Sequence, residues 1–143
     1  MNIKQLNSGL IDLIHNKAYQ LDQFMEVRWQ KHDGIDLSVS EWTAISLAYQ
    51  REKIAIAEVA RKMDISRQAT HKLIRNLEQK ELLAIHQLEN NKKAKSIQLT
   101  EEGVACYEKR RALKSELEQE VISKLGEEPI KALKSILKQD WGI

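Results

Sequence analysis

The chain has 143 residues, of which 42% are apolar and 31% charged, with five glycines, one proline and one cysteine. This balance fits one domain, residues 1–143, with a modest core, and it excludes a disordered chain. The single cysteine, Cys106, excludes an internal disulfide and favours a reducing, cytoplasmic setting. No apolar stretch approaches the roughly 20 residues of a membrane span, so we expect neither such a span nor a secretory signal.

The first third of the chain has the pattern of two helices. Apolar residues recur at three- and four-residue steps and predict a helix over residues 3–31, ended by residues 32–34. Ser38 and Glu41 then form a capping box, in which side chains satisfy the open backbone groups of a helix start. One face of this second helix carries Trp42, Ile45 and either Ala48 or Tyr49.

The middle of the chain predicts two short helices joined by a turn. A helix over residues 56–63 precedes a turn at Asp64, where left-handed backbone is common, and Ser66 caps a helix from Arg67 to about Lys80. Ala60 falls where the two helices must approach closely. The residues expected to fill the core between them are Val59, Met63, Ile65, Leu73 and Leu77.

The period of the pattern changes after this helix pair. Residues 82–88 are apolar and partly alternating, residues 89–94 are polar, and residues 95–99 alternate with period two, which predicts a β-hairpin with a basic tip. Thr100 then caps a long helix to about Leu125. Gly126 interrupts it, and a last helix with Pro129 in its first turn ends near Trp141. The fold class is therefore mainly α, with a two-stranded β hairpin.

Positive charge is concentrated in the middle third. Residues 51–95 carry eleven Lys and Arg against six Asp and Glu, whereas residues 1–50 carry four against six and residues 96–143 eight against nine. A basic segment in a near-neutral protein is typical of a polyanion site, although a solvated charged surface would have the same balance.

The second short helix carries polar residues at its start and along one face. This composition suits a helix that enters the major groove of DNA, where amide and guanidinium groups read base edges and cations contact phosphates. An ordinary amphipathic helical hairpin with a charged outer face is the alternative. The basic β-hairpin that follows favours DNA, because such a wing can reach the minor groove or phosphates. The predicted DNA-binding residues are Ser66, Arg67, Gln68, His71, Lys72, Arg75, Lys92, Lys93 and Lys95.

Two strings, IAEVARKMDISRQATHKLIRNLEQKELL at residues 56–83 and NNKKAKSIQLTEEG at residues 90–103, resemble the MarR family of winged helix-turn-helix transcriptional regulators. The resemblance implies a DNA-binding winged-helix lobe over residues 37–103, with a recognition helix and a wing. It also implies a homodimer formed by residues 1–33 and 104–143. A small-molecule or redox effector would act in the crevice between these parts, for which the candidate lining residues are His15, Tyr19 and Trp42.

The sequence departs from the family pattern in three places. The wing has Asn91, Lys92 and Lys93 where the family has Asp-x-Arg or Asp-Arg-Arg, and lysine lacks the planar fork of arginine. Glu81 stands where a glycine usually follows the recognition helix, so either the helix ends differently or this residue is strained. Thr70 replaces a usual apolar residue inside the recognition helix.

Enzymatic chemistry has no candidate residues in the sequence. We see no nucleophile with a base, no paired catalytic carboxylates, no metal-binding cluster and no phosphate loop, and so expect no enzyme, cofactor or metal. Cys106 is interpreted as a packed thiol rather than a redox sensor. The rival function is a winged-helix module that docks another protein; the lysine-containing polar face disfavours it, because such docking faces are depleted in lysine.

Overall fold

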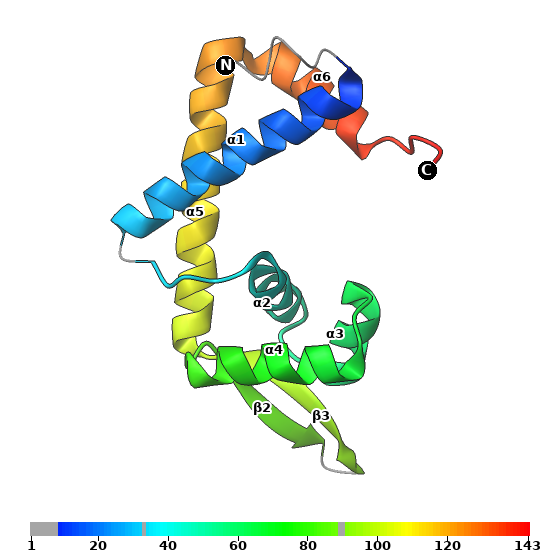
Figure 1. The fold of residues 1–143 in the computed structure, drawn as a ribbon. Helices are drawn as coiled ribbons and strands as arrows, with labels where there is room; N and C mark the ends of the chain where they lie inside the picture. The colour runs from blue at the N-terminus through cyan, green and yellow to red at the C-terminus, as the bar shows by residue number, and fades with distance from the viewer. Residues whose placement is uncertain (1–8, 33, 89–90) are drawn as a thin grey trace. The chain divides into compact units, whose positions relative to one another are not determined.

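The computed structural model describes residues 9–32, 34–88 and 91–143; of Leu88 and residues 91–93 it describes only the backbone. The chain divides into two compact units, a central unit, Asp33–Arg110, and a terminal unit, Met1–His32 with Arg111–Ile143. The elements in chain order (Figure 1) are α1 Leu10–Lys31, α2 Val39–Arg51, β1 Ile54–Ala55, α3 Ile56–Met63, α4 Arg67–Gln79, β2 Leu83–Leu88, β3 Asn91–Leu99, α5 Glu101–Leu125 and α6 Glu127–Lys138. The mainly helical fold class with a β wing is confirmed.

Local sequence signals start two helices of the central unit as expected. At α2 the Ser38 hydroxyl oxygen accepts from the Glu41 backbone N–H at 3.1 Å, and a Glu41 carboxylate oxygen accepts from the Ser38 N–H at 3.1 Å. At α4 the Ser66 hydroxyl oxygen accepts from the Ala69 N–H at 3.1 Å. These bonds satisfy backbone donors that a helix start leaves open, and the capping predictions are therefore confirmed.

The outermost helices are shorter than the sequence predicts. The expected first helix includes Gly9, but the Gly9 backbone is extended (φ −70°, ψ 150°) and α1 begins only at Leu10. The remainder of that prediction, residues 3–8, lies outside the described residues. At the other end α6 stops at Lys138 rather than near Trp141, because Gln139 is also extended (φ −68°, ψ 153°).

A left-handed residue makes the turn between α3 and α4. Asp64 has φ 52° and ψ 48°, as the sequence predicts, and the next N–H, that of Ile65, donates to the Ala60 carbonyl at 3.2 Å. The turn folds the two helices together over a shared core, in which Val59, Leu73 and Leu77 are buried and Met63 and Ile65 are partly buried.

A third strand, which the sequence analysis missed, joins the β-hairpin. The two residues of β1 pair antiparallel with β3, with Ile54 opposite Ile97, and the sheet order is β1-β3-β2. On the other edge β2 pairs with β3 with Leu83 opposite Leu99. Ile54 and Ile97 are both buried, so the sheet carries the hydrophobic core from the helices to the base of the wing, which is formed by β2 and β3 (Figure 1).

The junction of β3 with α5 is built on a close backbone approach. The Thr100 hydroxyl accepts from the Gly103 N–H at 3.0 Å and donates to the Glu81 carbonyl at 2.6 Å. A Cβ atom at Gly103 would lie 1.9 Å from the Leu82 carbonyl oxygen, so only glycine fits. Glu81 itself has φ 62°, so the residue adopts the left-handed conformation in place of the usual glycine and is strained.

The terminal unit consists of α1, residues 111–125 of α5, and α6. Its buried apolar residues are Met25, Trp29, Leu113 and Ile130, and ion pairs join Arg28 to Glu120 and Lys134 to Glu118. Many other large apolar side chains of this unit are exposed. In the described part of the chain, no helix is both long enough and apolar enough to cross a membrane.

Candidate nucleic-acid interface

Helix α4 has two sharply different faces. Thr70, Leu73, Ile74 and Leu77 are buried against the central unit. The opposite face carries the residues that the sequence predicts for DNA contact: Arg67, Gln68, Lys72 and Arg75 are exposed, and His71 is half-buried. Their positions along the helix place them on one side, because residues three and four apart are neighbours on a helix surface.

Thr70 occupies its buried position without leaving a polar group unsatisfied. Its hydroxyl donates to the Ser66 carbonyl at 2.8 Å, one helical turn earlier. This bond stabilises a hydroxyl that burial would otherwise penalise. The departure from the usual apolar residue therefore leaves the first turn of α4 intact, and the residues predicted to contact DNA remain in place.

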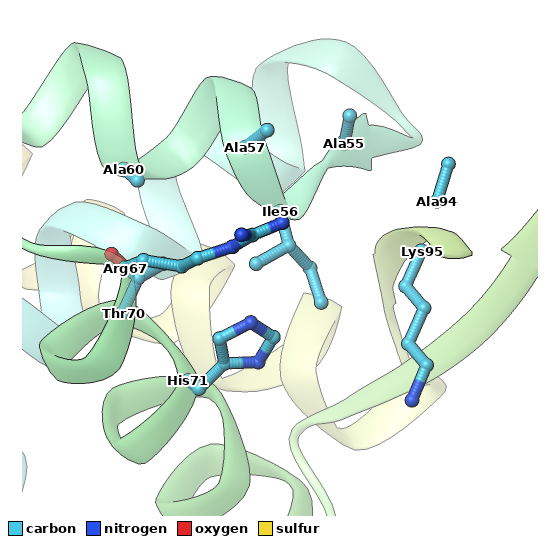
Figure 2. A pocket seen from close by; sticks show the side chains of 9 residues that line it. All are labelled: Ala55, Ile56, Ala57, Ala60, Arg67, Thr70, His71, Ala94 and Lys95. Atoms are coloured by element: carbon cyan, nitrogen blue, oxygen red, sulfur yellow. The ribbon is translucent and has the colours of Figure 1, made fainter.

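A hollow of about 460 Å³ lies between the start of α3, the first turns of α4 and the wing. Figure 2 shows the Arg67 side chain reaching across it toward the start of α3, the His71 ring pointing into it from α4, and Lys95 facing it from β3. The remaining lining residues are small or apolar: Ala55, Ile56, Ala57, Ala60, Thr70 and Ala94. The sequence predicted the basic residues of the hollow but not its small and apolar ones, because no periodic pattern indicates that β1, α3 and Ala94 lie together.

The wing residues predicted to contact DNA are only partly described. Lys95 is exposed, lies on β3 beside Ala94 and lines the hollow. Lys92 and Lys93 belong to the backbone of β3, but their side chains lie outside the described residues. Their contacts with phosphate or the minor groove stay predictions.

The three candidate effector residues belong to different units. His15 and Tyr19 are exposed on α1 of the terminal unit, whereas Trp42 is half-buried on α2 of the central unit. The guanidinium carbon of Arg110 lies 4.8 Å from the centre of the Trp42 ring, so a cation already occupies one face of this ring. A pocket that these three residues share stays a prediction.

The environment of Cys106 makes its thiol less reactive. Burial beside the central core raises its pKa, and this outweighs the opposing effect of Lys109 and Arg110. A raised pKa lowers the fraction of thiolate, the reactive form, which supports the interpretation of a packed thiol. Within residues 9–32, 34–88 and 91–143, no three His, Cys, Asp or Glu side chains gather in a way that could hold a metal ion.

The turn between α3 and α4, the exposed polar face of α4 and the adjoining three-stranded sheet define the class of the protein: it is a winged helix-turn-helix protein. Residues 37–95 match the model of the MarR family, and this match confirms the resemblance over that part of the chain. No curated protein matches the chain in sequence.

Solved structures of similar proteins support the same fold. A point mutant of S. aureus MepR is 21% identical, with a TM-score of 0.75, and the match covers 90% of this chain and 93% of that one. A cysteine-to-serine mutant of E. coli MarR is 20% identical, with a TM-score of 0.72 over 92% and 96% of the two chains. A structure of an S. aureus MepR–DNA complex is 21% identical, with a TM-score of 0.70 over 92% and 94%.

Proposed function

We propose that this protein is a transcriptional regulator that binds duplex DNA sequence-specifically as a homodimer. The observation that carries the proposal is the exposed face of α4, where polar and basic side chains gather beside Lys95 of the wing. The same fold in the MepR–DNA complex supports the proposal.

The chemistry of this face suits the major groove. Gln68 is exposed one residue after the start of α4, and an amide can pair with adenine through two hydrogen bonds. Lys72 and Arg75 lie further along the helix and are suited to the phosphate backbone on either side. The Ser66 cap satisfies only the Ala69 N–H, so the other open N–H groups of the first turn add positive potential at the end of α4 that would face DNA.

Exposed apolar side chains of the terminal unit support the homodimer. On α1 they include Leu10, Ile11 and Phe24, and on α6 Leu133, Ile136 and Leu137. Within this unit a groove of about 360 Å³, lined mostly by apolar side chains, lies between α1, α5 and α6. An apolar surface of this kind is unfavourable in water and is buried when two copies associate about a two-fold axis.

A small-molecule effector is the second part of the proposal, with His15, Tyr19 and Trp42 as its candidate contacts. Tyr19 is 66% exposed in the monomer and therefore accessible to a ligand or to a second copy of the chain. Substituting Tyr19 by alanine should weaken the response of DNA binding to an effector without weakening binding in its absence.

The proposal is tested by titrating the protein with the duplex from upstream of its own gene and with a random duplex of equal length, at two salt concentrations. We expect tighter binding to the upstream duplex and a steep fall of both affinities with salt, because phosphate contacts release counterions. A randomised pool of duplexes is then offered to the protein. If the protein prefers none of them, the proposed regulator function is wrong, and the alternative function, a winged-helix module that docks another protein, is favoured.

A further inference from the structure

The hollow between α4 and the wing is lined by two cationic side chains and a histidine. Arg67 and His71 of α4 and Lys95 of β3 line it, and none of the described residues that line it is an aspartate or glutamate. Its other walls are alanine side chains and Ile56. Basic donors beside an apolar wall suit a ligand that has an anionic group attached to a less polar body.

The position of the hollow identifies this ligand, given the proposed function. If α4 lies in the major groove and the wing reaches the adjacent minor groove, one sugar–phosphate backbone must pass between them, because that backbone separates the two grooves. The space between α4 and the wing is this hollow. Its volume of about 460 Å³ is within the usual range of pockets that hold whole small ligands, so a phosphate and its sugar fit.

We infer that the hollow seats one phosphodiester of the bound duplex, with Arg67, His71 and Lys95 donating to its non-bridging oxygens and the apolar wall contacting the deoxyribose. The inference rests on the proposed function and refines it. Arg67 and His71, which the sequence predicts to be DNA-binding residues, contact the backbone in this arrangement rather than base edges. Gln68, which is exposed and does not line the hollow, faces the groove.

A scan of the preferred duplex with single methylphosphonates, which are neutral, tests this contact. In the wild type we expect the neutralisation of one phosphate per half-site to weaken binding more than that of any other. The loss should be about tenfold, which is the size expected when a charge-assisted hydrogen bond is removed. In Arg67→Gln and in Lys95→Gln the same neutralisation should cost less than about threefold, since one of the donors to this phosphate is already lost. Lys72→Gln is the matched control, an exposed cation of α4 outside the hollow, and should keep the tenfold effect.

Equal sensitivity of all variants to this phosphate would overturn the inference while leaving the proposed function intact. A second arm uses inorganic phosphate with the full chain and no DNA, at constant ionic strength, and follows the side-chain NMR signals of Arg67 and His71. We expect both signals to shift in the wild type and the His71 signal to stay fixed in Arg67→Gln. If inorganic phosphate binds but no duplex does, the proposed function fails and the phosphodiester assignment fails with it.

Discussion

Neighbouring residues at the start of α4 have different surroundings. Arg67 reaches into the hollow beside the wing, whereas Gln68 is exposed and does not line it. Gln68 is also uncharged, so its removal leaves the long-range attraction between protein and DNA unchanged. This pair can therefore separate recognition of sequence from attraction to the backbone.

We predict that Gln68→Ala reduces affinity for the preferred duplex by about tenfold or more, with little change for random duplex, because a bidentate amide–adenine contact discriminates by about 1–3 kcal/mol. Arg67→Ala should weaken binding to both duplexes. The measurement is a pair of titrations per variant at one salt concentration. An unchanged ratio of the two affinities in Gln68→Ala would remove this residue from sequence recognition.

Glu81 carries a conformational strain that glycine would relieve. Its φ of 62° is left-handed, which costs an L-residue about 1 kcal/mol or more. We predict that Glu81→Gly raises the free energy of unfolding by up to about 1 kcal/mol, measured by urea denaturation at fixed protein concentration. Glu78→Gly, the same change inside α4, is the control and should destabilise by about 0.5–1 kcal/mol. If Glu81→Gly and Glu78→Gly both lowered the free energy of unfolding, the prediction that Glu81 is strained would be wrong.

At the scale of elements, the wing is attached through the junction where β3 becomes α5. Thr100 bonds to both Glu81 and Gly103, and Gly103 lies against the Leu82 carbonyl. The end of the segment after α4 and the start of α5 are thus fixed to each other, and the hairpin between them is anchored at its base.

We predict that Gly103→Ala lowers the free energy of unfolding by at least about 2 kcal/mol, because the new Cβ would lie 1.9 Å from a backbone carbonyl that cannot move alone. Urea denaturation followed by circular dichroism measures the change. Gly9→Ala is the control, since the nearest atom to its Cβ would be a side-chain oxygen of Asp12 at 3.4 Å. Similar losses in both variants would mean that the close approach is not the cause.

An ion pair joins the start of α2 to the end of α4. The Lys80 ammonium donates to a Glu41 carboxylate oxygen at 3.0 Å and to the Asp36 carbonyl at 3.2 Å. Burial alone would raise the pKa of Glu41, but the hydrogen bonds from Ser38 and Lys80 and the charge of Lys80 outweigh it, so the pKa is lowered. The stabilisation by ionised Glu41 is therefore complete above the ordinary carboxyl pKa and is lost as the pH falls through the lowered value.

Lys80→Met should accordingly reduce stability at pH 7 by up to about 1 kcal/mol, and the difference from the wild type should shrink once the pH is well below about 4. Denaturation midpoints measured across this pH range check it. Lys72→Met removes an exposed lysine of the same helix and should show no such dependence. A deficit in Lys80→Met that is independent of pH would show that the lysine acts through packing or through its bond to the Asp36 carbonyl, and not through Glu41.

At the scale of the whole molecule, a single chain leaves many apolar side chains of the terminal unit exposed to water. In a two-fold dimer they become buried, and the two recognition helices can then lie about 34 Å apart, one turn of duplex DNA. Sequence-specific binding to two half-sites would follow from this spacing.

We predict that the wild type sediments as a dimer at micromolar concentration and that Phe24→Asp with Leu137→Asp produces a folded monomer with at least about tenfold weaker DNA binding. Phe24 and Leu137 are 57% and 56% exposed in the single chain. Their substitution therefore removes few contacts within the monomer, which should stay folded. Val39→Asp, at an 83% exposed apolar residue of the central unit, is the control and should stay dimeric. A monomeric wild type would refute the dimer.

The sequence by itself determined what depends on local interactions. The capping box of Ser38 and Glu41, the left-handed Asp64 and the cap at Ser66 act within a few residues, so their spacing predicts helix starts and the turn. The polar face of α4 follows from helical periodicity in the same way. These signals were sufficient for the fold class and for the prediction that polar side chains share one face of α4.

Only the tertiary structure decided the features that join distant segments. Strand β1 has two residues and no period of its own, and it exists because Ile54 pairs with Ile97, far along the chain. The fit of Gly103 against Leu82 and the convergence of Arg67 and Lys95 on one hollow likewise depend on how β3 is placed beside α3 and α4. Such contacts form because the shared core fixes the positions of whole elements, and no local pattern of residues contains that information.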